Sequence, residues 1–573
     1  MKKLGADIKG FGLLLMGVIV MLCSCRDELY SIPSSETEGT SRNLVISLTV
    51  QQPGLQSPTP PAPFDTGYEL GFTEEECQIH TITLIMMGVY NGEELFETWQ
   101  TIEPSEPTNG IYDVQFTLSG ITGTKHFYIL ANAEQKHINA FWAKDRIFDA
   151  GEGQSGHNIV GNLMEINHNE NGDGEGSNIL MAGIVKSTNS GDRDIVIPTG
   201  DGNEDTDEKI TIDTSANLVR TVAKILLTCV PKSDAETDYV KVIDRKDAET
   251  STDGENTGWI KLAEVNYMLN VLNRKTYLDY REDTKDDGYL IDPNYEMSNW
   301  IEKRTNDNKT TYGIKDLDAY QKEFLFYDTQ DMVEMLNTSI PTYKGGEPCM
   351  VRTATLYNKN RIGKENATSR DHYTEGLYCT ENTVYNNDMT FANEADFQSA
   401  IRYVTTRVMI GAKYTPKQIW NGEDAPVQAS TEADAQKILQ EVTDDENPLE
   451  PVTYPAGTFW RDSDGNYYSL AGMKKKLQKA PKTDFSRYDG GWGYYYTYID
   501  ENAQNGAIKD TQTRWGIKRN HYYILKVDKI IAPGSPFPGN ETMRIHSELV
   551  DWIDKGGSEE EIKVPQQSET AQP

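Results

Sequence analysis

Apolar and polar residues alternate along much of this chain. The clearest example is residues 43–50 (NLVISLTV), in which Leu44, Ile46, Leu48 and Val50 occupy every second position. A period of two predicts a β-strand with one buried face. Comparable patterns predict further strands at Ile79–Tyr90, Tyr112–Leu118, His126–Ala131, Ile179–Val185, Asp194–Pro198, Lys209–Ile212 and Arg220–Val230, the last of which could begin as a short helix.

The second half of the chain continues in the same style. Its predicted strands, rich in β-branched and aromatic residues, are Trp259–Asn273, Arg274–Leu278, Tyr403–Tyr414, Gly457–Leu470, Tyr494–Ile499 and Tyr522–Ile530. Asp464-Gly465 lies between two aromatic pairs and predicts a hairpin turn. A helical period is best developed at Asp396–Tyr403 and Thr431–Val442, whereas 151–176, 281–348 and 415–450 read as loops. We therefore expect a mainly β fold with two antiparallel β-sandwich domains, long loop insertions and few short helices.

Length and local composition suggest where these domains begin and end. A chain of 573 residues has room for two to four domains. Residues 231–257 are acidic and polar, and they read as a boundary or an insertion. The expected division is a signal peptide at 1–24, a polar leader at 25–42, sandwich domains at 43–235 and 236–556, and a polar tail at 557–573.

The N-terminus has the pattern of a secretory signal. Basic residues precede the apolar run Phe11–Leu22, which is too short to span a bilayer but suits a signal-peptide core. The following Leu22-Cys23-Ser24-Cys25 resembles the bacterial lipoprotein processing box, which would make Cys25 the lipidated first residue of the mature protein. An ordinary signal peptide cleaved nearby is the alternative. Arg26-Asp27-Glu28 resembles the surface-export signal of Bacteroidetes lipoproteins.

Charge excludes several classes of partner. The chain has 89 acidic and 55 basic side chains, a formal net charge of -34. Such a surface repels nucleic acids and anionic lipid, and we identify no basic stripe that would overcome this repulsion. Membrane attachment must therefore come from a hydrophobic or covalent group.

No catalytic or metal-binding constellation stands out, so we expect neither an enzyme nor a cofactor. The sequence contains no HExxH, P-loop or GxSxG motif. Beyond the signal region remain Cys77, Cys229, Cys349 and Cys379, without CxxC spacing; one or two disulfides or buried free thiols are both compatible with this.

Three further segments contain residues that could bind a ligand. Asn169–Gly174 resembles the start of an EF-hand loop, but Leu180 occupies the twelfth position, so we favour a flexible turn over calcium binding. Residues 201–207 form a second acidic stretch, for which a turn is likewise favoured. The aromatic run at 491–496 could stack sugars, but a strand carrying core aromatics is the simpler interpretation.

A series of segments, in order, resembles the FimA/Mfa-type fimbrillin family of Bacteroidales. The segments that carry the resemblance are Ile82-Thr-Leu-Ile-Met-Met, Gly123-Thr-Lys-His-Phe-Tyr-Ile-Leu-Ala-Asn132, Arg220-Thr-Val-Ala-Lys224, Tyr378-Cys-Thr-Glu-Asn-Thr383, residues 403–416, the hairpin 458–468, Ile517-Lys-Arg519-Asn520-His521-Tyr522-Tyr523 and residues 534–552. The resemblance implies two transthyretin-like sandwiches and a lipoprotein precursor exported to the outer membrane surface. It also implies that a protease removes the first strand, and that the C-terminal strand of the next subunit fills the groove left behind.

Applied to this sequence, the family mechanism names two strands. The strand to be displaced is Asn43–Val50, with a permanent edge strand as the alternative. The candidate donor residues are Met543, Ile545, Leu549 and Trp552. Family members are commonly cut after an Arg that follows the first strand, but the candidate here, Arg42, precedes it, and the next arginine is Arg146. Either another protease cuts the Pro-rich stretch 51–67, or this subunit keeps its strand and acts as a base or terminator.

The function expected from the resemblance is that of a structural subunit of cell-surface fimbriae that supports adhesion. The expected partners are other copies of the chain, accessory fimbrial subunits, a processing protease, adhesion receptors and, for the precursor, the outer membrane; nucleic acid is not among them. Two alternatives remain, namely a surface glycan-binding lipoprotein and a non-polymerising anchor or accessory subunit.

Overall fold

The computed structural model describes most of the chain between residues 43 and 551. The described residues are 43–51, 76, 78–108, 111–119, 121–143, 145–153, 160–168, 174–198, 209–233, 235–243, 257–283, 286–306, 309–337, 351–356, 376–386, 389–445, 450–499, 514–527, 529–531, 533–538 and 546–551.

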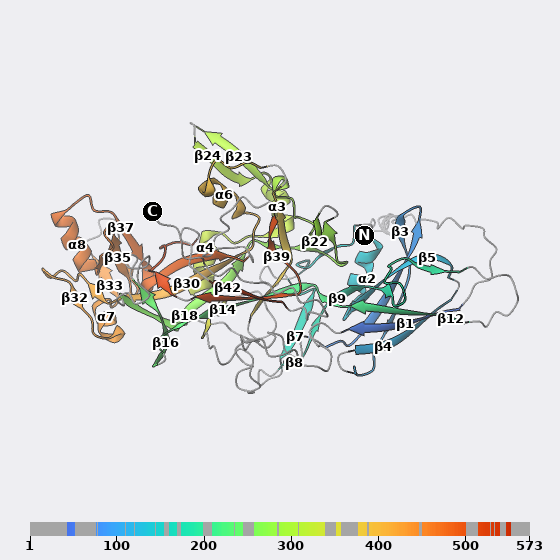
Figure 1. The fold of residues 1–573 in the computed structure, drawn as a ribbon. Coiled ribbons are helices and arrows are strands. Elements are labelled where there is room, and N and C mark those ends of the chain that lie inside the picture. The colour runs from blue at the N-terminus through green and yellow to red at the C-terminus, as the bar shows by residue number, and fades with distance from the viewer. Residues whose placement is uncertain are drawn as a thin grey trace, which may run out of the picture.

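Two sheets make up the N-terminal half, which we define as residues 43–220 (Figure 1). One has the order β10-β12-β1-β4, built from β1 (Asn43–Gln51), β4 (Ile111–Ser119), β10 (Lys186–Ser187) and β12 (Lys209–Asn217). The other has the order β13-β9-β5-β2-β3, built from β2 (Ile82–Tyr90), β3 (Glu93–Ile102), β5 (Gly123–Ala131), β9 (Met181–Ile184) and β13 (Val219–Arg220), with β11 (Ile195–Ile197) beside β5.

Two larger sheets make up the C-terminal half, residues 222–551. The first has the order β27-β14-β40-β42, with β28 also on β14; its strands are β14 (Val222–Cys229), β27 (Thr355–Leu356), β28 (Leu377–Thr380), β40 (His521–Val527) and β42 (His546–Asp551). The second has the order β15-β16-β18-β30-β38, with β26 also on β18; its strands are β15 (Pro231–Ser233), β16 (Glu236–Val240), β18 (Gly258–Asn270), β26 (Arg352–Thr353), β30 (Arg407–Pro416) and β38 (Trp492–Tyr498).

Shorter strands and helices make up the rest of the described secondary structure. The remaining strands are β6 (Ile147–Asp149), β7 (Met164–His168), β8 (Gly174–Ile179), β17 (Val242–Ile243), β19 (Leu272–Asn273), β20 (Lys275–Tyr277), β21 (Glu282–Asp283), β22 (Asp286–Leu290), β23 (Ile301–Asn306), β24 (Lys309–Ile314), β25 (Phe324–Leu325), β29 (Asn382–Tyr385), β31 (Gln418–Ile419), β32 (Val427–Gln428), β33 (Val442–Asp444), β34 (Val452–Tyr454), β35 (Phe459–Asp462), β36 (Tyr467–Tyr468), β37 (Phe485–Tyr488), β39 (Arg514–Ile517) and β41 (Ile530–Ile531). The helices are α2 (Gln135–Trp142), α3 (Leu317–Glu323), α4 (Thr329–Asn337), α6 (Glu394–Ile401), α7 (Glu432–Ile438) and α8 (Leu470–Lys479), with 3₁₀ turns η2 (Met297–Asn299) and η3 (Asp489–Gly491).

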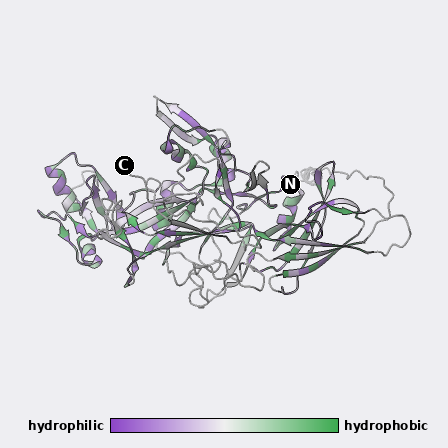
Figure 2. Cartoon of the chain, in the orientation of Figure 1, coloured by the Kyte–Doolittle hydropathy of each residue, from purple (hydrophilic) through white to green (hydrophobic). Residues whose placement is uncertain are grey.

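The core is apolar and continuous through both halves. One cluster of buried residues includes Phe116 of the N-terminal half and Ile225 and Leu525 of the C-terminal half, each fully shielded from solvent. Figure 2 shows hydrophobic residues along β1 and its neighbours, and hydrophilic residues on α8 and the β23–β24 hairpin. The sheets of each half therefore meet around a shared apolar core, as burial of one face of each strand requires.

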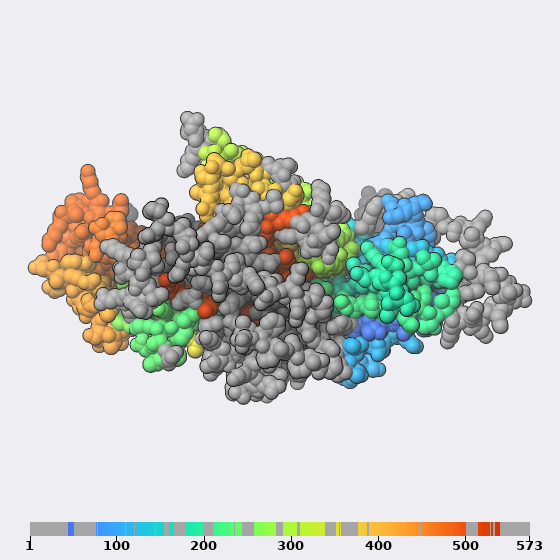
Figure 3. Space-filling view, viewed as in Figure 1, coloured from blue at the N-terminus to red at the C-terminus, as the bar shows by residue number. Residues whose placement is uncertain are grey.

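The molecule is elongated, with different parts of the chain at its two ends (Figures 1 and 3). The N-terminal half lies at one end. A lobe formed by residues 418–491 lies at the other, and it has its own small cluster around Trp460 and Tyr468. Because β30 and β38 pair directly with each other, this lobe is an insertion that leaves the sheet and returns to it.

Most strand predictions, and the mainly β fold, are confirmed. Residues 43–50 form β1, the Asp464-Gly465 hairpin joins β35 to β36, and both predicted helices are present as α6 and α7. The helical alternative for the start of 220–230 is wrong, since these residues form β13 and β14.

Other predictions need correction. Residues 281–348 are not simply loop, because α3, α4 and the β23–β24 hairpin lie there; β7 and β8 likewise interrupt the loop expected at 151–176. The sheets are also not purely antiparallel, because β1 runs parallel to β12 and β14 runs parallel to β40. Strands so distant in sequence need no tight hairpin, so either direction is available to them.

The chain changes from one half to the other earlier than expected. β13 pairs with β9 in the N-terminal half, and β14 pairs with β40 in the C-terminal half, so the change falls at Thr221. The domain limits at 235 and 236 stay a prediction.

Candidate functional site

β1 occupies the middle of a sheet and not its edge. It pairs in parallel with β12, from Asn43↔Lys209 to Gln51↔Asn217, and antiparallel with β4, from Asn43↔Ser119 to Gln51↔Ile111. Both ladders extend over the whole strand. The edge position in the alternative of a permanent edge strand is therefore wrong, whereas the removal of β1 stays a prediction.

The two faces of β1 differ sharply in burial. Its inward side chains are buried to within 1% of full shielding: Leu44, Ile46, Leu48 and Val50. They face a core that includes Phe116, which is also fully buried. On the outer face Thr49 is exposed, and its Oγ1 donates to Asp113 Oδ1 at 3.0 Å. Burial of one aliphatic side chain stabilises a fold by about 1.5–3 kcal/mol, so this strand is a major part of its sheet.

Loss of β1 would create a deep slot. The facing edges of β4 and β12 would lose their partners together, since β1 pairs with both. Unpaired backbone N–H and C=O groups beside an apolar floor bind an added strand, as in β-strand addition. We call this the β1 slot: the space now filled by residues 43–51 between β4 and β12.

β42 lies near the C-terminus, in the segment that is predicted to be donated to another copy. It runs antiparallel to β40, from His521↔Asp551 to Lys526↔His546, and has no second neighbour among the strands that the structure describes. Leu549 lies in β42 opposite Tyr523, whereas Met543, Ile545 and Trp552 lie outside the described residues. The donor role of this segment stays a prediction.

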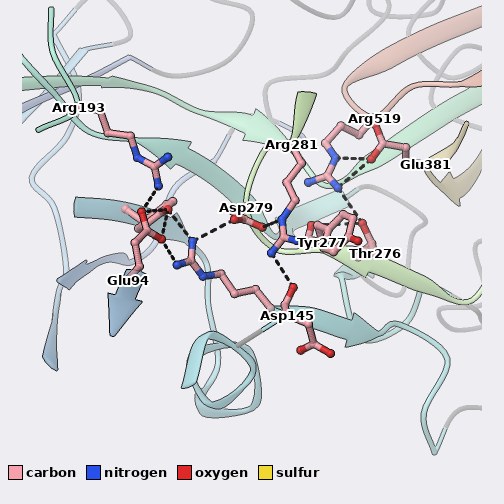
Figure 4. A network of polar contacts seen from close by, with 11 residues as sticks. Glu94, Asp145, Arg193, Thr276, Tyr277, Asp279, Arg281, Glu381 and Arg519 are labelled. Carbon is pink, nitrogen blue, oxygen red and sulfur yellow. Dashed lines mark hydrogen bonds and ion pairs between the residues drawn. The ribbon is translucent and has the colours of Figure 1, made fainter. Parts of the chain in front are cut away.

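A polar joint connects the two halves (Figure 4). Arg146, buried and at φ 54°, binds Glu94 through one guanidinium nitrogen and Asp279 Oδ2 through the other, the latter at 3.0 Å. Glu94 belongs to β3 in the N-terminal half, and Asp279 belongs to the C-terminal half. Beside them, Arg281 Nη2 donates to the carbonyl oxygen of Asp145 at 2.6 Å. A non-glycine residue in the left-handed region is strained, so the surroundings must hold Arg146 in place.

Backbone pairing reinforces this joint. β6 of the N-terminal half pairs antiparallel with β20 of the C-terminal half. Outside this ladder, Leu278 N donates to Arg146 O at 3.1 Å and Ala150 N donates to Arg274 O at 2.8 Å. The two halves therefore share both an antiparallel β-ladder and a buried ion-pair network.

Charged residues in the segments that resemble fimbrillins lie at the same junction. Arg220 Nη1 donates to Asn520 Oδ1 at 3.2 Å, and Lys224 Nζ pairs with Glu76 Oε1 at 2.7 Å. Arg519 Nη2 pairs with Glu381 Oε2 at 2.9 Å, with both side chains buried. Sequence reasoning assigned these residues to motifs without giving them a role. The available signal was a charged residue inside an otherwise apolar strand, since such residues are rarely buried unless paired.

Burial and pairing shift the pKa of two carboxyl groups in opposite directions. Burial alone would raise the pKa of Glu94, but hydrogen bonds from His126, Arg146 and Arg193 outweigh it and lower the pKa to about 2. Burial, with the nearby Glu381, raises the pKa of Asp292 to about 7. The N-terminal half thus holds a strongly ionised carboxylate, and the C-terminal half holds one that titrates near neutral pH.

The other predicted sites have less support. Cys25, Arg42, residues 169–173 of the first candidate calcium loop and all of the second, 201–207, lie outside the described residues, as do Cys77 and Cys349. Cys229 is a buried free thiol, and burial raises its pKa to about 12. Within the described part of the chain, no group of three or more metal-ligating side chains gathers, and no helix has the length and apolarity to cross a membrane.

The aromatic run at 491–496 belongs to the core. It lies largely in β38, and both Tyr494 and Tyr495 are buried. The core interpretation of this run is confirmed.

Comparison with known proteins supports the fimbrillin resemblance. Residues 486–555, which include β38 to β42, match the family model described as "Major fimbrial subunit protein type IV, Fimbrillin, C-terminal". No curated protein matches the chain significantly. The resemblance is thus confirmed over this C-terminal segment, and it supports a role in a fimbrium, a cell-surface structure.

Several solved structures are similar to this chain at low identity. A fimbrilin from Porphyromonas gingivalis is 14% identical with a TM-score of 0.34, covering 90% of this chain and 98% of its own. The tip fimbrial protein of the same organism, with a C-terminal truncation, is 10% identical with a TM-score of 0.28, covering 89% and 100%. A fimbrial assembly protein from Parabacteroides distasonis is 12% identical with a TM-score of 0.19, covering 49% and 79%.

Proposed function

We propose that this protein is a structural, non-enzymatic subunit of a cell-surface fimbria and that it polymerises by strand exchange. The observation that carries the proposal is the position of β1, which fills a slot between β4 and β12 with four buried apolar side chains. Removal of this strand leaves a site that a strand from another copy satisfies. The family match at residues 486–555 supports the fimbrial setting.

In this proposal the precursor is a lipoprotein, exported to the outer membrane surface on a lipid attached to Cys25. A protease then cuts the connection that follows β1, within the Pro-rich stretch 51–67. A cut after Arg42 leaves β1 in place, because Arg42 precedes Asn43, the first residue of the strand. No lysine or arginine occurs between Arg42 and Lys125, so the protease must cleave after a non-basic residue.

The donor is the C-terminal segment that includes β42. As an edge strand among the described residues, it can leave its own sheet by breaking one ladder. The formal charge of -34 makes the surfaces of two copies repel each other. Directional backbone hydrogen bonds and apolar side chains in the β1 slot supply the attraction that this surface lacks. The polymer then supports adhesion.

Mass spectrometry of subunits from sheared surface fimbriae tests the proposal. We expect mature subunits that lack residues 43–50 and begin within or after 51–67, together with a multimer ladder in unboiled SDS samples. A precursor whose Pro-rich stretch 51–67 is blocked to proteolysis provides the control, and it should remain monomeric. Polymerised subunits that retain residues 43–50 would contradict strand removal.

An anchor or terminator role is the second candidate. The absence of Arg between β1 and Arg146 favours it, because the maturation site common in the resembled family is missing. Such a subunit would keep β1 permanently. The same mass spectrometry then shows intact residues 43–50 in a protein present at few copies per fimbria.

A further inference from the structure

The segment between β40 and β42 is tied to the body of the protein at two places. The first is β41, which pairs in parallel with β17. Ile530 is fully buried, and its N–H donates to the carbonyl oxygen of Lys241 at 3.0 Å. This attachment fixes the chain directly after β40.

The second attachment lies three to five residues further on, against β38. Tyr494 N donates to Ser535 O at 2.8 Å, and Ser535 N donates to Tyr494 O at 3.0 Å. The hydroxyl of Tyr488 donates to the carbonyl oxygen of Gly534 at 2.7 Å. Ser535 is buried, so this contact is a closed two-bond bridge to the edge of a sheet.

Two glycines permit this close approach. A methyl group on Gly493 would lie 1.5 Å from the carbonyl oxygen of Pro533, so no side chain fits there. Gly534 has φ +74°, which favours glycine, and a methyl group there would lie 2.7 Å from Tyr494 O. We call residues 530–535 the root of the C-terminal segment.

Phe537 is the exposed residue just beyond the root, between a partly buried Pro536 and a buried Pro538. Phe537 is 59% exposed, and its backbone N–H donates to Ser535 Oγ at 3.3 Å. The chain then reaches β42, which pairs with β40 alone among the described strands. A tightly held root is thus followed by an exposed aromatic side chain and a strand with one ladder.

We propose that residues 530–535 stay fixed to their own subunit while the segment beyond them is donated, and that Phe537 makes the first apolar contact with the second copy. The inference rests on the proposed strand exchange, and it names the occupant of the exposed Phe537 surface as a neighbouring copy of this chain. The position of Phe537 in the chain supports a neighbouring copy as the occupant. Phe537 precedes β42, so a copy that binds the donated β42 must also lie near Phe537.

The first test compares two exposed apolar residues. Phe537→Ser and the control Leu317→Ser, a residue of α3 that is 54% exposed, are made in the full chain. After proteolytic removal of β1, multimer formation is followed by sedimentation, and unfolding of the monomer by circular dichroism. We expect about tenfold weaker association for Phe537→Ser, as loss of one partly buried aromatic contact predicts, and no change for Leu317→Ser. Unfolding of both monomers should match that of the unchanged chain.

The outcomes separate this inference from the function on which it rests. If the unchanged chain forms no multimers, the proposed function fails. If it forms multimers and Phe537→Ser does so equally well, the role of Phe537 fails. If Phe537→Ser lowers the stability of the monomer, its surface is covered by its own chain, and the inference is overturned.

Hydrogen exchange on the monomer tests the root independently of polymerisation. We expect amides of 546–551 to exchange faster than those of 530–535, because an edge strand opens more easily than a doubly attached segment. In Gly493→Ala the displaced root should lose its protection. Equal exchange of both segments in the unchanged chain would overturn the fixed root.

Discussion

β1 and β42 each belong to one of the large sheets, but they are held in different ways. β1 has neighbours on both sides along its whole length, whereas β42 has β40 alone among the described strands. To leave its sheet, β1 must break two ladders and expose four apolar side chains; β42 must break one ladder. A strand held like β1 leaves only when the chain is cut, and a strand held like β42 can leave and return.

Under the proposed strand exchange, this difference suits the two strands to opposite tasks. The strand that blocks assembly must be stable enough to protect the precursor until proteolysis. The strand that links copies must be available without unfolding its own half. The same backbone chemistry serves both, and the number of neighbours decides which task each performs.

The largest expected effect comes from replacing a leucine by proline, once in β1 and once in β42. Leu48→Pro removes a backbone donor within the two-sided β1 and opens a cavity, so we expect the free energy of unfolding to fall by more than about 5 kcal/mol. Leu549→Pro in the one-sided β42 should cost about 1 kcal/mol, because edge strands tolerate proline. Urea denaturation of the two variants measures both values, and equal losses would break the comparison.

A smaller effect tests whether the two halves act together. Arg146→Gln leaves Glu94 and Asp279 without their shared cation in a buried site, so we expect a loss of about 3–5 kcal/mol. Arg304→Gln is the matched control, because Arg304 pairs with Glu302 at 2.6 Å on a half-exposed hairpin and should cost at most about 0.5 kcal/mol. Calorimetry should show one unfolding transition in the unchanged chain and two in Arg146→Gln. A single transition in both would argue against the joint as the link between the halves.

The smallest predicted effect is a pH-dependent loss of stability that is confined to the C-terminal half. The pKa of Asp292, about 7 in the fold, is raised above its ordinary value of 3.8. Its contribution to stability is therefore full at low pH and is lost as pH rises through about 7. Between about pH 5 and about pH 8 we expect the C-terminal half to lose about 2–3 kcal/mol. Hydrogen exchange of β42 and β1 across this range in Arg146→Gln, whose halves are expected to unfold separately, measures it, and only β42 should respond.

The N-terminal half should respond to acid instead. The pKa of Glu94, lowered to about 2, gives stability that is present above about pH 4.5 and is lost as pH falls through 2. Burial lowers the pKa of His137 to about 4, so its contribution is likewise lost as pH falls from 6.5 through 4. Asp292→Asn is the control that should abolish the alkaline response and leave the acid response unchanged. Alkaline loss of β1 protection would show that the two regions are not separable.

Much of the fold was predictable because burial of one face leaves a period of two in the sequence. β1 and β4 each show it, and their predicted limits agree with the structure to within a few residues. β3 was missed because its sequence, EELFETWQTI, carries charges that bind Arg146 and Lys125 instead of facing solvent. α8 was missed because its lysines obscure a short apolar face.

The candidate site was only partly predictable. The inward residues of β1 follow from alternation alone, but the position of β1 between β12 and β4 depends on pairing across more than 150 residues of sequence, which no local pattern encodes. The joint was hidden for the same reason, since Arg146 and Asp279 are 133 positions apart. Local sequence reports which face of a strand is buried and does not report its neighbours.

The even spacing of Leu44, Ile46, Leu48 and Val50 limits what the β1 slot can recognise. A guest strand shifted by one residue presents its polar face and is rejected, but a strand shifted by two presents the same apolar face. The slot therefore distinguishes an odd shift of the guest strand from an even one, but it does not distinguish one even shift from another. Successive acceptable placements differ by about 7 Å along the strand. The repeat distance of a polymer built on this slot must be set elsewhere, by the length of chain that joins a fixed point of one subunit to the strand it lends.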